Sequence, residues 1–380
     1  MKVKAAVLRE MGLPLPYSMS RPLVIESLDL DPPGPHEVLI RLAATGLCHS
    51  DLSVINGERP RPLPMVLGHE GAGEVVEVGE HVHDLVAGDH VIMVFMPSCG
   101  HCAPCASGRP ALCEPGASAN AKGELLSGAR RLHNDRHLLH HHLGCSAFAD
   151  HAVVSRRSLI KIDRDLPLSQ AALFGCAVLT GVGAVVNTAA VQAGQSVVIV
   201  GLGGVGQAAL LGAVAAGAAQ VIAVDIADDK LALARSLGAT ATVNATEDAV
   251  QRVRTLTNGG ADAVIEMAGS VGALETAYQM TRRGGTTVTA GLPPPHAALA
   301  VNVVRLVAEE RTLKGSYIGS CVPVRDIPRY VALYRAGRLP VDRLASGHLR
   351  LEDINLGFDR LHEGAAVRQL IDFDAGCSDA

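Results

Sequence analysis

The spacing of apolar and polar residues changes along the chain. Up to about residue 160, short β-type runs such as VLIRLAATG (38–46) and HVIMVF (90–95) alternate with irregular stretches rich in Pro and Gly. From about 175 to 320, apolar runs such as SVVIVG and QVIAVD alternate with stretches rich in Ala and Leu. Buried strands that alternate with helices are typical of a doubly wound parallel sheet. We therefore predict a mostly β region followed by an α/β domain that contains such a sheet.

The segment from about residue 321 predicts two helices and two short strands. DIPRYVALYRAGRL (326–339) and LEDINLGFDRLHEG (351–364) have helical character, whereas LRL (349–351) and VRQLIDF (367–373) are strand-like. A segment of this length is too short for a core of its own. We expect it to pack on the first region.

The composition excludes several classes of protein. Hydrophobic residues make up 48% of the 380 residues and charged residues 19%, which provides for a large core and disfavours disorder. The net charge is −5 and aromatic residues make up only 3%, so no nucleic-acid surface is expected. Glycines divide the uncharged segment 196–224 into strand, turn, helix and strand, which disfavours a membrane span. The start, MKVKAAVLRE, predicts a strand and no signal peptide, so we expect a cytoplasmic protein.

A glycine-rich turn predicts a nucleotide site. In VVIVGLGGVGQAAL (197–210) a strand is followed by Gly201, Gly203 and Gly206 and then by a helix. These glycines permit a tight turn, the close approach of a pyrophosphate and close contact of helix with strand. Asp225 ends the next strand, where a carboxylate binds the ribose hydroxyls of NAD and repels the 2′-phosphate of NADP. No arginine follows Asp225, and Lys230 is placed to reach the same ribose, so NAD is the predicted coenzyme.

Four cysteines predict a metal-binding lobe. They follow the spacing C-x2-C-x2-C-x7-C and are Cys99, Cys102, Cys105 and Cys113. Four thiolates match a closed tetrahedral zinc site, which is structural because no position is open for a substrate. A ferredoxin-type cluster is the competing interpretation, but that run has a shorter last gap and a Pro after its last cysteine. His101 lies within the run, although four cysteines already complete the ligand set.

A second group of possible ligands is spread along the chain. Cys48 lies in GLCHSD, His69 and Glu70 lie in GHEGAGEVVEVG, and Cys176 lies in FGCAVLTG. Two cysteines and one histidine leave a fourth position for water or substrate, as in a catalytic zinc site. Composition alone does not establish this grouping, since lone buried cysteines usually serve packing. The histidine-rich stretch 132–144 has no diagnostic spacing, and a solvated or interface loop is favoured there over a metal site.

At these motifs the chain resembles the zinc-dependent medium-chain alcohol dehydrogenases, and within them the liver-type, class III-like branch. The likeness covers almost the whole chain and includes GLCHSD, GHEGAGEVVEVG, the four-cysteine lobe, FGCAVLTG, VGLGGVG and the closing AAVRQLIDF. It implies a GroES-like catalytic domain at 1–177 and 321–380, with the lobe at about 97–115, and a Rossmann coenzyme domain at 178–320. It also implies an active site between the domains, two zinc ions per chain, and NAD.

The resemblance assigns roles to individual residues. Cys48, His69 and Cys176 would be the ligands of the catalytic zinc, and Glu70 would stand just behind the metal. Asp51 would hydrogen-bond the far nitrogen of His69. Ser50 would take the proton of an alcohol that zinc polarises, while hydride passes to the nicotinamide. The implied coenzyme contacts are His49, Thr180, Gly201, Gly203, Gly204, Val205, Gly206, Asp225, Lys230 and Arg368, the last of them on the pyrophosphate, and the implied substrate pocket includes Ser50, Phe95, His142, Leu143, Leu292 and Tyr317.

Two positions depart from the family's pattern. Relatives often carry a histidine at the position of Ser53, which passes the proton on to solvent. A serine is no base near pH 7, so water or another group has to complete the relay. Relatives often carry an arginine on the coenzyme phosphates at the position of His49. A neutral imidazole holds a pyrophosphate less strongly, so weaker NADH binding and fast turnover are expected.

The expected substrates are medium-chain or aromatic primary alcohols and their aldehydes, because Ser50 is smaller than the threonine of some relatives. The glutathione-dependent formaldehyde branch is an alternative, but it expects an acidic residue about where Arg59 stands and a basic one about where Ala117 stands, and these two positions carry neither. A zinc-free medium-chain reductase and a non-catalytic NAD-binding protein are further alternatives, and the complete ligand set argues against both. The long segment between the lobe and Cys176 resembles that of liver-type dimers, so a homodimer built on the Rossmann sheet around 300–320 is expected.

Overall fold

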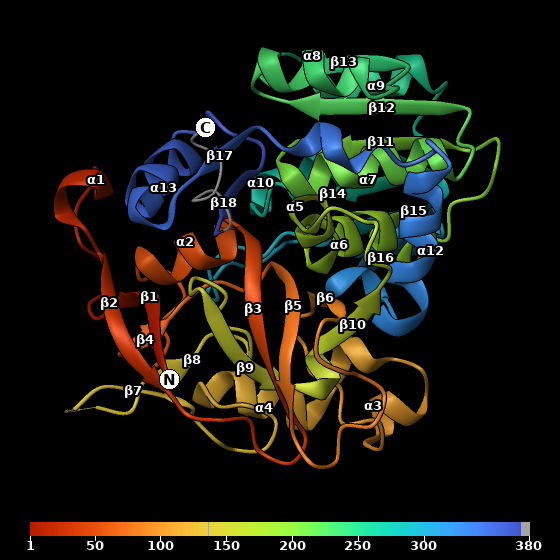
Figure 1. Cartoon of the computed structure of the whole chain (residues 1–380). Helices are drawn as coiled ribbons and strands as arrows, with labels where there is room; N and C mark the ends of the chain where they lie inside the picture. The colour runs from red at the N-terminus through yellow and green to blue at the C-terminus, as the bar shows by residue number, and fades with distance from the viewer. Residues whose placement is uncertain (136, 374–380) are drawn as a thin grey trace. The chain divides into compact units, whose positions relative to one another are not determined.

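The computed structural model describes residues 1–135 and 137–373, and its contacts divide the chain into two compact units (Figure 1). Unit 1 consists of Met1–Cys176, Val322–Pro328 and the segment from Ala345 onward. Unit 2 consists of Ala177–Cys321 and Arg329–Leu344. The helix α12 (Pro323–Arg335) therefore begins in unit 1 and ends in unit 2.

Unit 1 contains two β-sheets. The strands of the first are β1 (Lys2–Leu8), β2 (Leu23–Leu30), β4 (Met65–Val66), β7 (Leu132–His133) and β8 (His140–His141). Their order is β7-β2-β1-β4-β8. The strands of the second are β3 (Glu37–Gly46), β5 (Gly71–Val78), β6 (His90–Met93), β9 (His151–Ser155), β10 (Leu159–Ile162), β17 (Gly347–Leu349) and β18 (Gln369–Asp372). Their order is β10-β6-β5-β3-β18-β17, and β9 also pairs with β3.

A buried cluster of aliphatic and aromatic side chains joins the helices of unit 1 to its strands. Leu8, Leu47, Ile55, Phe148 and Phe358 belong to it, and all five are at most 1% exposed. Burial of each such side chain contributes about 1.5–3 kcal/mol. The cluster therefore secures helix α2 (His49–Ile55) and helix α13 (Ile354–His362) on strand β1. The other helices of unit 1 are α1 (Tyr17–Ser20), α3 (Ala103–Ala106), α4 (Glu114–Lys122) and α5 (Leu168–Ala171).

Asp359 of α13 ties the start of α1 to the same core. Its carboxylate accepts hydrogen bonds from the backbone N–H groups of Tyr17 (2.5 Å) and Ser18 (2.9 Å). Burial acts to raise the pKa of Asp359, but these hydrogen bonds outweigh it and hold the pKa below its usual range. The ionised carboxylate is thus the form that stabilises this contact.

The substitution Asp359→Asn is expected to lower the free energy of unfolding at pH 7 by about 1 kcal/mol, the usual worth of a cap. Because the folded pKa is depressed, the stabilisation is complete above the unfolded pKa of about 3.9 and is lost as pH falls through the folded value. Urea unfolding at pH 7, 5 and 4 measures the difference from the wild type. A difference that grows on acidification would contradict this account.

Unit 2 is built on a six-stranded sheet. Its strands are β11 (Ser196–Val200), β12 (Gln220–Asp225), β13 (Ala241–Asn244), β14 (Ala261–Glu266), β15 (Thr281–Thr289) and β16 (Thr312–Gly315). Their order is β13-β12-β11-β14-β15-β16, and every neighbouring pair is parallel. Its helices include α6 (Ala177–Gly183), α7 (Gly204–Ala215), α8 (Asp228–Ser236), α9 (Ala249–Leu256), α10 (Val271–Met280) and α11 (Val303–Ala308). This strand order is that of the Rossmann fold, which confirms the predicted α/β class with a doubly wound parallel sheet.

Among the described residues, no single helix has both the length and the apolar character that crossing a membrane requires. One bent pair of helices, Leu168–Gly175 with Ala177–Thr188, meets those two criteria when taken together.

Candidate active site

The GLCHSD motif forms the turn between β3 and α2. Cys48 is the residue that precedes the helix, and its Sγ lies 3.5 Å from the backbone N–H of Ser50, which donates to it. Gly46 faces the side chain of Glu70, and a Cβ added there would lie 2.4 Å from Oε2 of that carboxylate. A residue larger than glycine would therefore displace Glu70. The sequence offers only the glycine itself as a signal of this contact.

The motif GHE, residues 68–70, is held in a second turn. Gly68 has φ +89°, a left-handed conformation that glycine adopts without a steric penalty. A Cβ at this position would also lie 2.5 Å from the backbone nitrogen of Phe148. Glycine is thus required twice over, and the turn places His69 and Glu70 in the interior, where they are 1% and 0% exposed.

These turns bring together the side chains that the sequence grouped as catalytic ligands. The ligand atoms of Cys48, His69, Glu70 and Cys176 all lie within 4.8 Å of one another, and all four residues are buried. Tetrahedral zinc with Zn–S distances near 2.3 Å places ligand atoms roughly 3.8 Å apart. Two thiols and an imidazole beside a carboxylate form a donor set that zinc accepts. The residues present therefore fit a zinc ion.

The two thiols differ in acidity. A hydrogen bond with Cys176 lowers the pKa of Cys48, and His69 adds to this effect while burial opposes it. The same contact and burial raise the pKa of Cys176. Thiolates are the forms that bind metal, so metal binding at this site releases whatever protons the two thiols carry.

Glu70 is paired with Arg368 from the end of the chain. Nη1 of Arg368 lies 2.8 and 2.7 Å from the two carboxylate oxygens and 3.0 Å from the carbonyl oxygen of Leu47. Burial raises the pKa of Glu70 to about 7, although the guanidinium opposes this shift. Sequence reasoning did not find this pair, because the two residues are 298 positions apart and no local pattern links them. The resemblance implies that the guanidinium of Arg368 binds the coenzyme pyrophosphate. In the structure Arg368 is 3% exposed, and its guanidinium forms an ion pair with Glu70.

Asp51 lies on the other side of His69. Its Oδ1 accepts a hydrogen bond from the backbone N–H of Gly68 at 3.0 Å and lies 3.2 Å from Nδ1 of His69. Burial acts to raise the pKa of Asp51, but the neighbouring His69 and His142 imidazoles outweigh it and lower the pKa. An ionised carboxylate on Nδ1 leaves Nε2 of His69 free to face the thiols, which is the arrangement that metal-binding histidines usually have.

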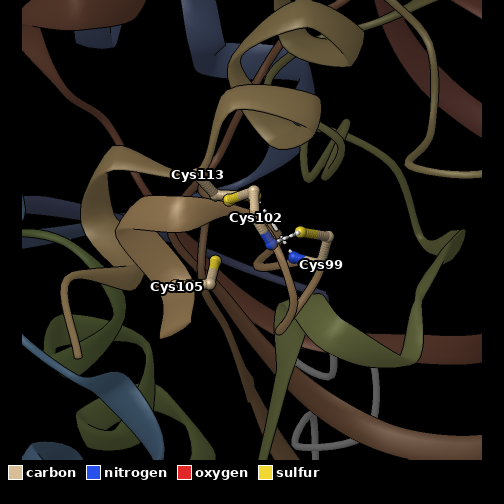
Figure 2. Close-up of side chains that lie close together, drawn as sticks. All are labelled: Cys99, Cys102, Cys105 and Cys113. Atoms are coloured by element: carbon tan, nitrogen blue, oxygen red, sulfur yellow. Dashed lines mark hydrogen bonds between the residues drawn. The ribbon is translucent and has the colours of Figure 1, made fainter. Parts of the chain in front are cut away.

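The four cysteines of the predicted lobe converge on one point (Figure 2). Their sulfur atoms lie within 4.8 Å of one another, with 4.0 Å between Cys102 and Cys113, far longer than a disulfide bond. Burial acts to raise the pKa of Cys99, but the backbone N–H groups of residues 101 and 102 outweigh it and lower the pKa to about 6. The ring of His101 is directed elsewhere, with Nδ1 3.0 Å from the carbonyl oxygen of Cys99. The lobe is a structural zinc site with four cysteine ligands.

The glycine-rich turn of unit 2 joins β11 to α7. Gly201 has φ +89°, and a Cβ at Gly206 would lie 1.9 Å from the carbonyl oxygen of Gly201. At Gly203 an added Cβ would meet no atom within 4 Å, so this side of the turn is open to a ligand. Asp225 ends β12 and accepts hydrogen bonds from the backbone N–H groups of residues 202 and 227 at 2.6 and 3.0 Å. The turn and the carboxylate are arranged to hold a nucleotide cofactor.

The other coenzyme and pocket residues occupy varied surroundings. His49 is exposed, whereas Ser50, Thr180, Val205, Lys230 and Tyr317 are half-buried and Gly204 is buried. Phe95 is 8% exposed, and its ring meets that of His69 edge to face with centroids 5.4 Å apart. Leu143 is 7% exposed and Leu292 is 54% exposed. Of the expected pocket residues, Phe95 contacts the candidate zinc ligand His69, and His142 contacts Asp51, the carboxylate partner of His69.

The histidines of the 132–144 stretch do not form one cluster. His133 pairs with Asp31, and His140 contacts Arg130 and the carbonyl oxygen of Lys122. Burial lowers the pKa of His141 to about 4, and its Nε2 accepts a hydrogen bond from the backbone N–H of Arg131. His142 is the member of the stretch that reaches the candidate active site.

Fold and site define a zinc-binding dehydrogenase, and comparison with known proteins agrees. The family model of the alcohol dehydrogenase GroES-like domain matches residues 34–164, and that of zinc-binding dehydrogenases matches residues 204–336. Alcohol dehydrogenase class-3 of Drosophila melanogaster is 39% identical over 94% of this chain and 96% of its own length. S-(hydroxymethyl)glutathione dehydrogenase of Paracoccus denitrificans is 36% identical over 98% of this chain and 100% of its own length. The crystal structure of benzyl alcohol dehydrogenase from Acinetobacter calcoaceticus is 32% identical, covers 98% of this chain and 99% of that one, and superposes with a TM-score of 0.91.

These matches show that the chain belongs to the zinc-binding medium-chain alcohol dehydrogenase family, which confirms the resemblance seen in its motifs. It is a zinc-dependent alcohol dehydrogenase, an oxidoreductase for small-molecule substrates, and it is similar to the class III enzymes.

Proposed function

We propose that the enzyme interconverts medium-chain or aromatic primary alcohols and their aldehydes with NAD. The observation that carries this proposal is the buried set of Cys48, His69 and Cys176 beside the ring of Phe95. Three ligands leave one position for the substrate, and an aromatic side chain next to it favours an apolar alcohol. The similarity to a benzyl alcohol dehydrogenase supports the same substrate class.

Different residues of unit 1 have different roles in the proposed reaction. When bound, zinc supplies a Lewis acid that makes the alcohol hydroxyl more acidic, and NAD supplies the hydride acceptor. Asp51 fixes the tautomer of His69 by accepting from its Nδ1–H. Ser50 receives the proton of the alcohol, and its position in the turn is held by the contact of its backbone with Cys48. Since Ser53 is not a base near neutral pH, the proton continues to solvent through water.

Asp225 supports NAD as the coenzyme. Its carboxylate is half-buried and already fixed by two backbone N–H groups, so its negative charge is held beside the glycine-rich turn. A fixed negative charge there accepts hydrogen bonds from a ribose and repels a 2′-phosphate.

A kinetic panel tests this function. We expect kcat/KM with NAD to be highest for benzyl alcohol, octanol and their aldehydes, and metal analysis to find two zinc ions per chain. NADP in place of NAD is expected to lower kcat/KM at least tenfold. A preference for S-(hydroxymethyl)glutathione, the substrate in the name of the Paracoccus relative, would replace this proposal with the glutathione-dependent alternative.

His49→Arg is expected to tighten NADH binding about tenfold, since a hydrogen bond to a charged group is worth about 1.5 kcal/mol or more. The exposed His49 would gain a permanent charge where the family binds the coenzyme phosphates. Fluorescence titration gives the Kd of NADH. His83→Arg is the matched control, because it adds the same charge at another exposed position of unit 1. Equal affinities of His49→Arg and wild type would refute the expectation.

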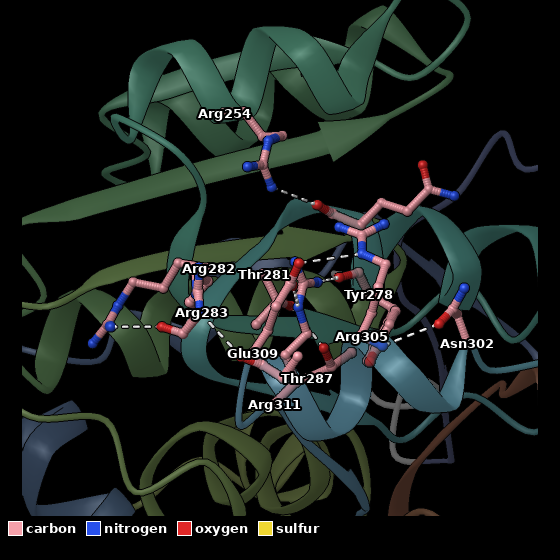
Figure 3. A network of polar contacts seen from close by, with 12 residues as sticks. Arg254, Tyr278, Thr281, Arg282, Arg283, Thr287, Asn302, Arg305, Glu309 and Arg311 are labelled. Carbon is pink, nitrogen blue, oxygen red and sulfur yellow. Dashed lines mark hydrogen bonds and ion pairs between the residues drawn. The ribbon is translucent and has the colours of Figure 1, made fainter.

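We also propose a homodimer formed at the β16 edge of unit 2. Strand edges carry unpaired backbone groups that another chain can pair with. Helix α11, the element that precedes β16 in the chain, exposes three valines, Val303 (67%), Val304 (76%) and Val307 (71%). Arg305 and Arg311 both pair with Glu309 at the end of α11, and Arg283 donates to the carbonyl oxygen of Ala308 (Figure 3). This network keeps the apolar face of α11 in a fixed position.

Sedimentation tests the dimer. The wild type is expected at twice the chain mass of 39.4 kDa, and the double substitution Val304→Glu with Val307→Glu at the mass of a single chain. Val324→Glu, which changes another exposed valine, should leave the dimer intact. A monomeric wild type, or a tetramer that survives the double substitution, would be incompatible with this interface.

A further inference from the structure

Asp51 is shared by two buried imidazoles. Nδ1 of His69 lies 3.2 Å from the carboxylate, and Nδ1 of His142 lies 3.1 Å from its Oδ1. The two rings meet edge to face, with centroids 5.6 Å apart. Asp51 is 0% exposed, and the two histidines are each 1% exposed. A carboxylate enclosed in this way depends on its protein neighbours for every contact.

The chemistry of the contact fixes the tautomer of His142. An ionised carboxylate only accepts hydrogen bonds, so an Nδ1 atom this close to Oδ1 has to carry the hydrogen. Among the described residues, neither Nδ1 of His142 nor Oδ2 of Asp51 has a hydrogen-bond partner of good geometry. Nδ1 of His142 thus lies 3.1 Å from Oδ1 of Asp51 without the geometry of a hydrogen bond, and the contact is one between a buried ring nitrogen and a buried carboxylate.

The backbone of His142 is anchored by a tight turn. Its N–H donates to Oγ of Ser146 at 3.1 Å, and its carbonyl oxygen accepts from the N–H groups of Cys145 and Ser146. Leu143 and Ser146 have φ values of +52° and +51°, which such residues rarely adopt unless the surroundings impose them. The turn is joined to the GHE motif, since the N–H of Ala147 donates to the carbonyl oxygen of Gly68. His142 is therefore held at a fixed place beside Asp51.

We infer that His142 is a positioning residue of the metal site, which holds the Asp51 carboxylate in the orientation that orients His69. Oδ1 accepts from the N–H of Gly68 and lies against Nδ1 of His142, and these two contacts restrain the carboxylate from turning away from Nδ1 of His69. The resemblance had implied only a place for His142 in the substrate pocket. This inference rests on the proposed zinc chemistry of the site, but it concerns metal binding and needs no substrate for its test.

The same three side chains are also close enough to bind a metal ion of their own. We favour positioning, because Nε2 of His69 lies on the side of Glu70, at 3.8 Å from Oε1, where the thiols are. A metal on Nδ1 as well would require a doubly deprotonated imidazole. A third metal ion per chain would reveal that arrangement.

The test compares three variants of the full-length protein. His142→Phe keeps a ring but removes the donor, whereas His142→Asn restores an N–H near the position of Nδ1. His141→Asn is the matched control, because it alters the neighbouring buried histidine, which has no contact with Asp51 among those described. Two readouts are used: the rate at which a chelator removes the catalytic metal, and the visible spectrum of the site after substitution with Co²⁺.

We expect His142→Phe to release the catalytic metal about tenfold faster and to shift the Co²⁺ bands, in line with the effect of changing groups around metal ligands. His142→Asn should release the metal at a rate within about twofold of the wild type. His141→Asn should also stay within about twofold of that rate, even if its thermal stability is lower. The inference would be overturned if His142→Phe and the wild type released the catalytic metal at the same rate, or if all three variants released it equally faster. A third metal ion that is bound by the wild type and lost in His142→Phe would overturn it as well. A wild type that holds only the metal of the lobe would instead refute the proposed function.

Discussion

Replacement of His69 by alanine is expected to lower kcat/KM for alcohol oxidation on the order of 10³-fold, which corresponds to roughly 4 kcal/mol of transition-state stabilisation. The imidazole stands among two thiols and a carboxylate, all within 4.8 Å, so its removal breaks the ligand set. It also removes one of the two imidazoles that contact the buried carboxylate of Asp51. Metal analysis should show a fall from two zinc ions per chain to one.

The lobe provides an internal reference for this experiment. Its four sulfurs are separate from the His69 site, so the remaining zinc should resist removal as it does in the wild type. The exposed His83 supplies the control substitution His83→Ala, which should retain both metals and full activity. An alanine variant of His69 that keeps two zinc ions and wild-type kcat/KM would show that the buried set is not the catalytic one.

Asp225→Asn is expected to change the preference for NAD over NADP about 100-fold. The substitution keeps one oxygen to accept from the backbone N–H of Leu202, whereas the charge and the acceptor for the N–H of residue 227 are lost. A hydrogen bond to a charged group is worth about 1.5–3 kcal/mol, so we expect kcat/KM for NAD to fall about tenfold. Loss of the repulsion should raise kcat/KM for NADP by a similar factor.

Steady-state kinetics with both coenzymes measure this change. Asp229→Asn, at an exposed position of α8, removes an equal charge outside the turn and should leave the preference unchanged. If Asp225→Asn retained the wild-type ratio of kcat/KM values, another group would have to select the coenzyme.

Much of the fold was predictable because its signals are local. The alternation of apolar runs and Ala-rich stretches predicted the parallel sheet of unit 2. In the turn at 201–206, a side chain at Gly201 or Gly206 would collide with the backbone, and Gly203 leaves space for a ligand, as predicted. The spacing of the four lobe cysteines likewise confines their sulfurs to one small loop. In each case the residues that act together are near one another in the sequence.

The contacts around the metal site were not predictable in this way. Arg368 reaches Glu70 only because β18 pairs with β3, a register that no local pattern specifies. The histidines between residues 132 and 144 appeared as one feature, yet the neighbouring, equally buried His141 and His142 have different partners. Which of them reaches Asp51 depends on a turn with left-handed residues, and His142 itself carries no mark of its role in the sequence.

The pairing of Arg368 with Glu70 has a consequence for the order in which this enzyme is assembled. Synthesis proceeds from the N-terminus, so Cys48, His69, Glu70 and Cys176 all leave the ribosome well before residue 368. Until β18 has joined β3, the Glu70 carboxylate lacks its cation, and the loop at Leu47 lacks its hydrogen bond to the carbonyl oxygen of Gln369. The catalytic metal therefore meets its finished binding site only after residues 368 and 369 have been made and β18 has paired. The ligands of the lobe span 15 residues from Cys99 to Cys113, so the lobe can take up its metal much earlier in synthesis.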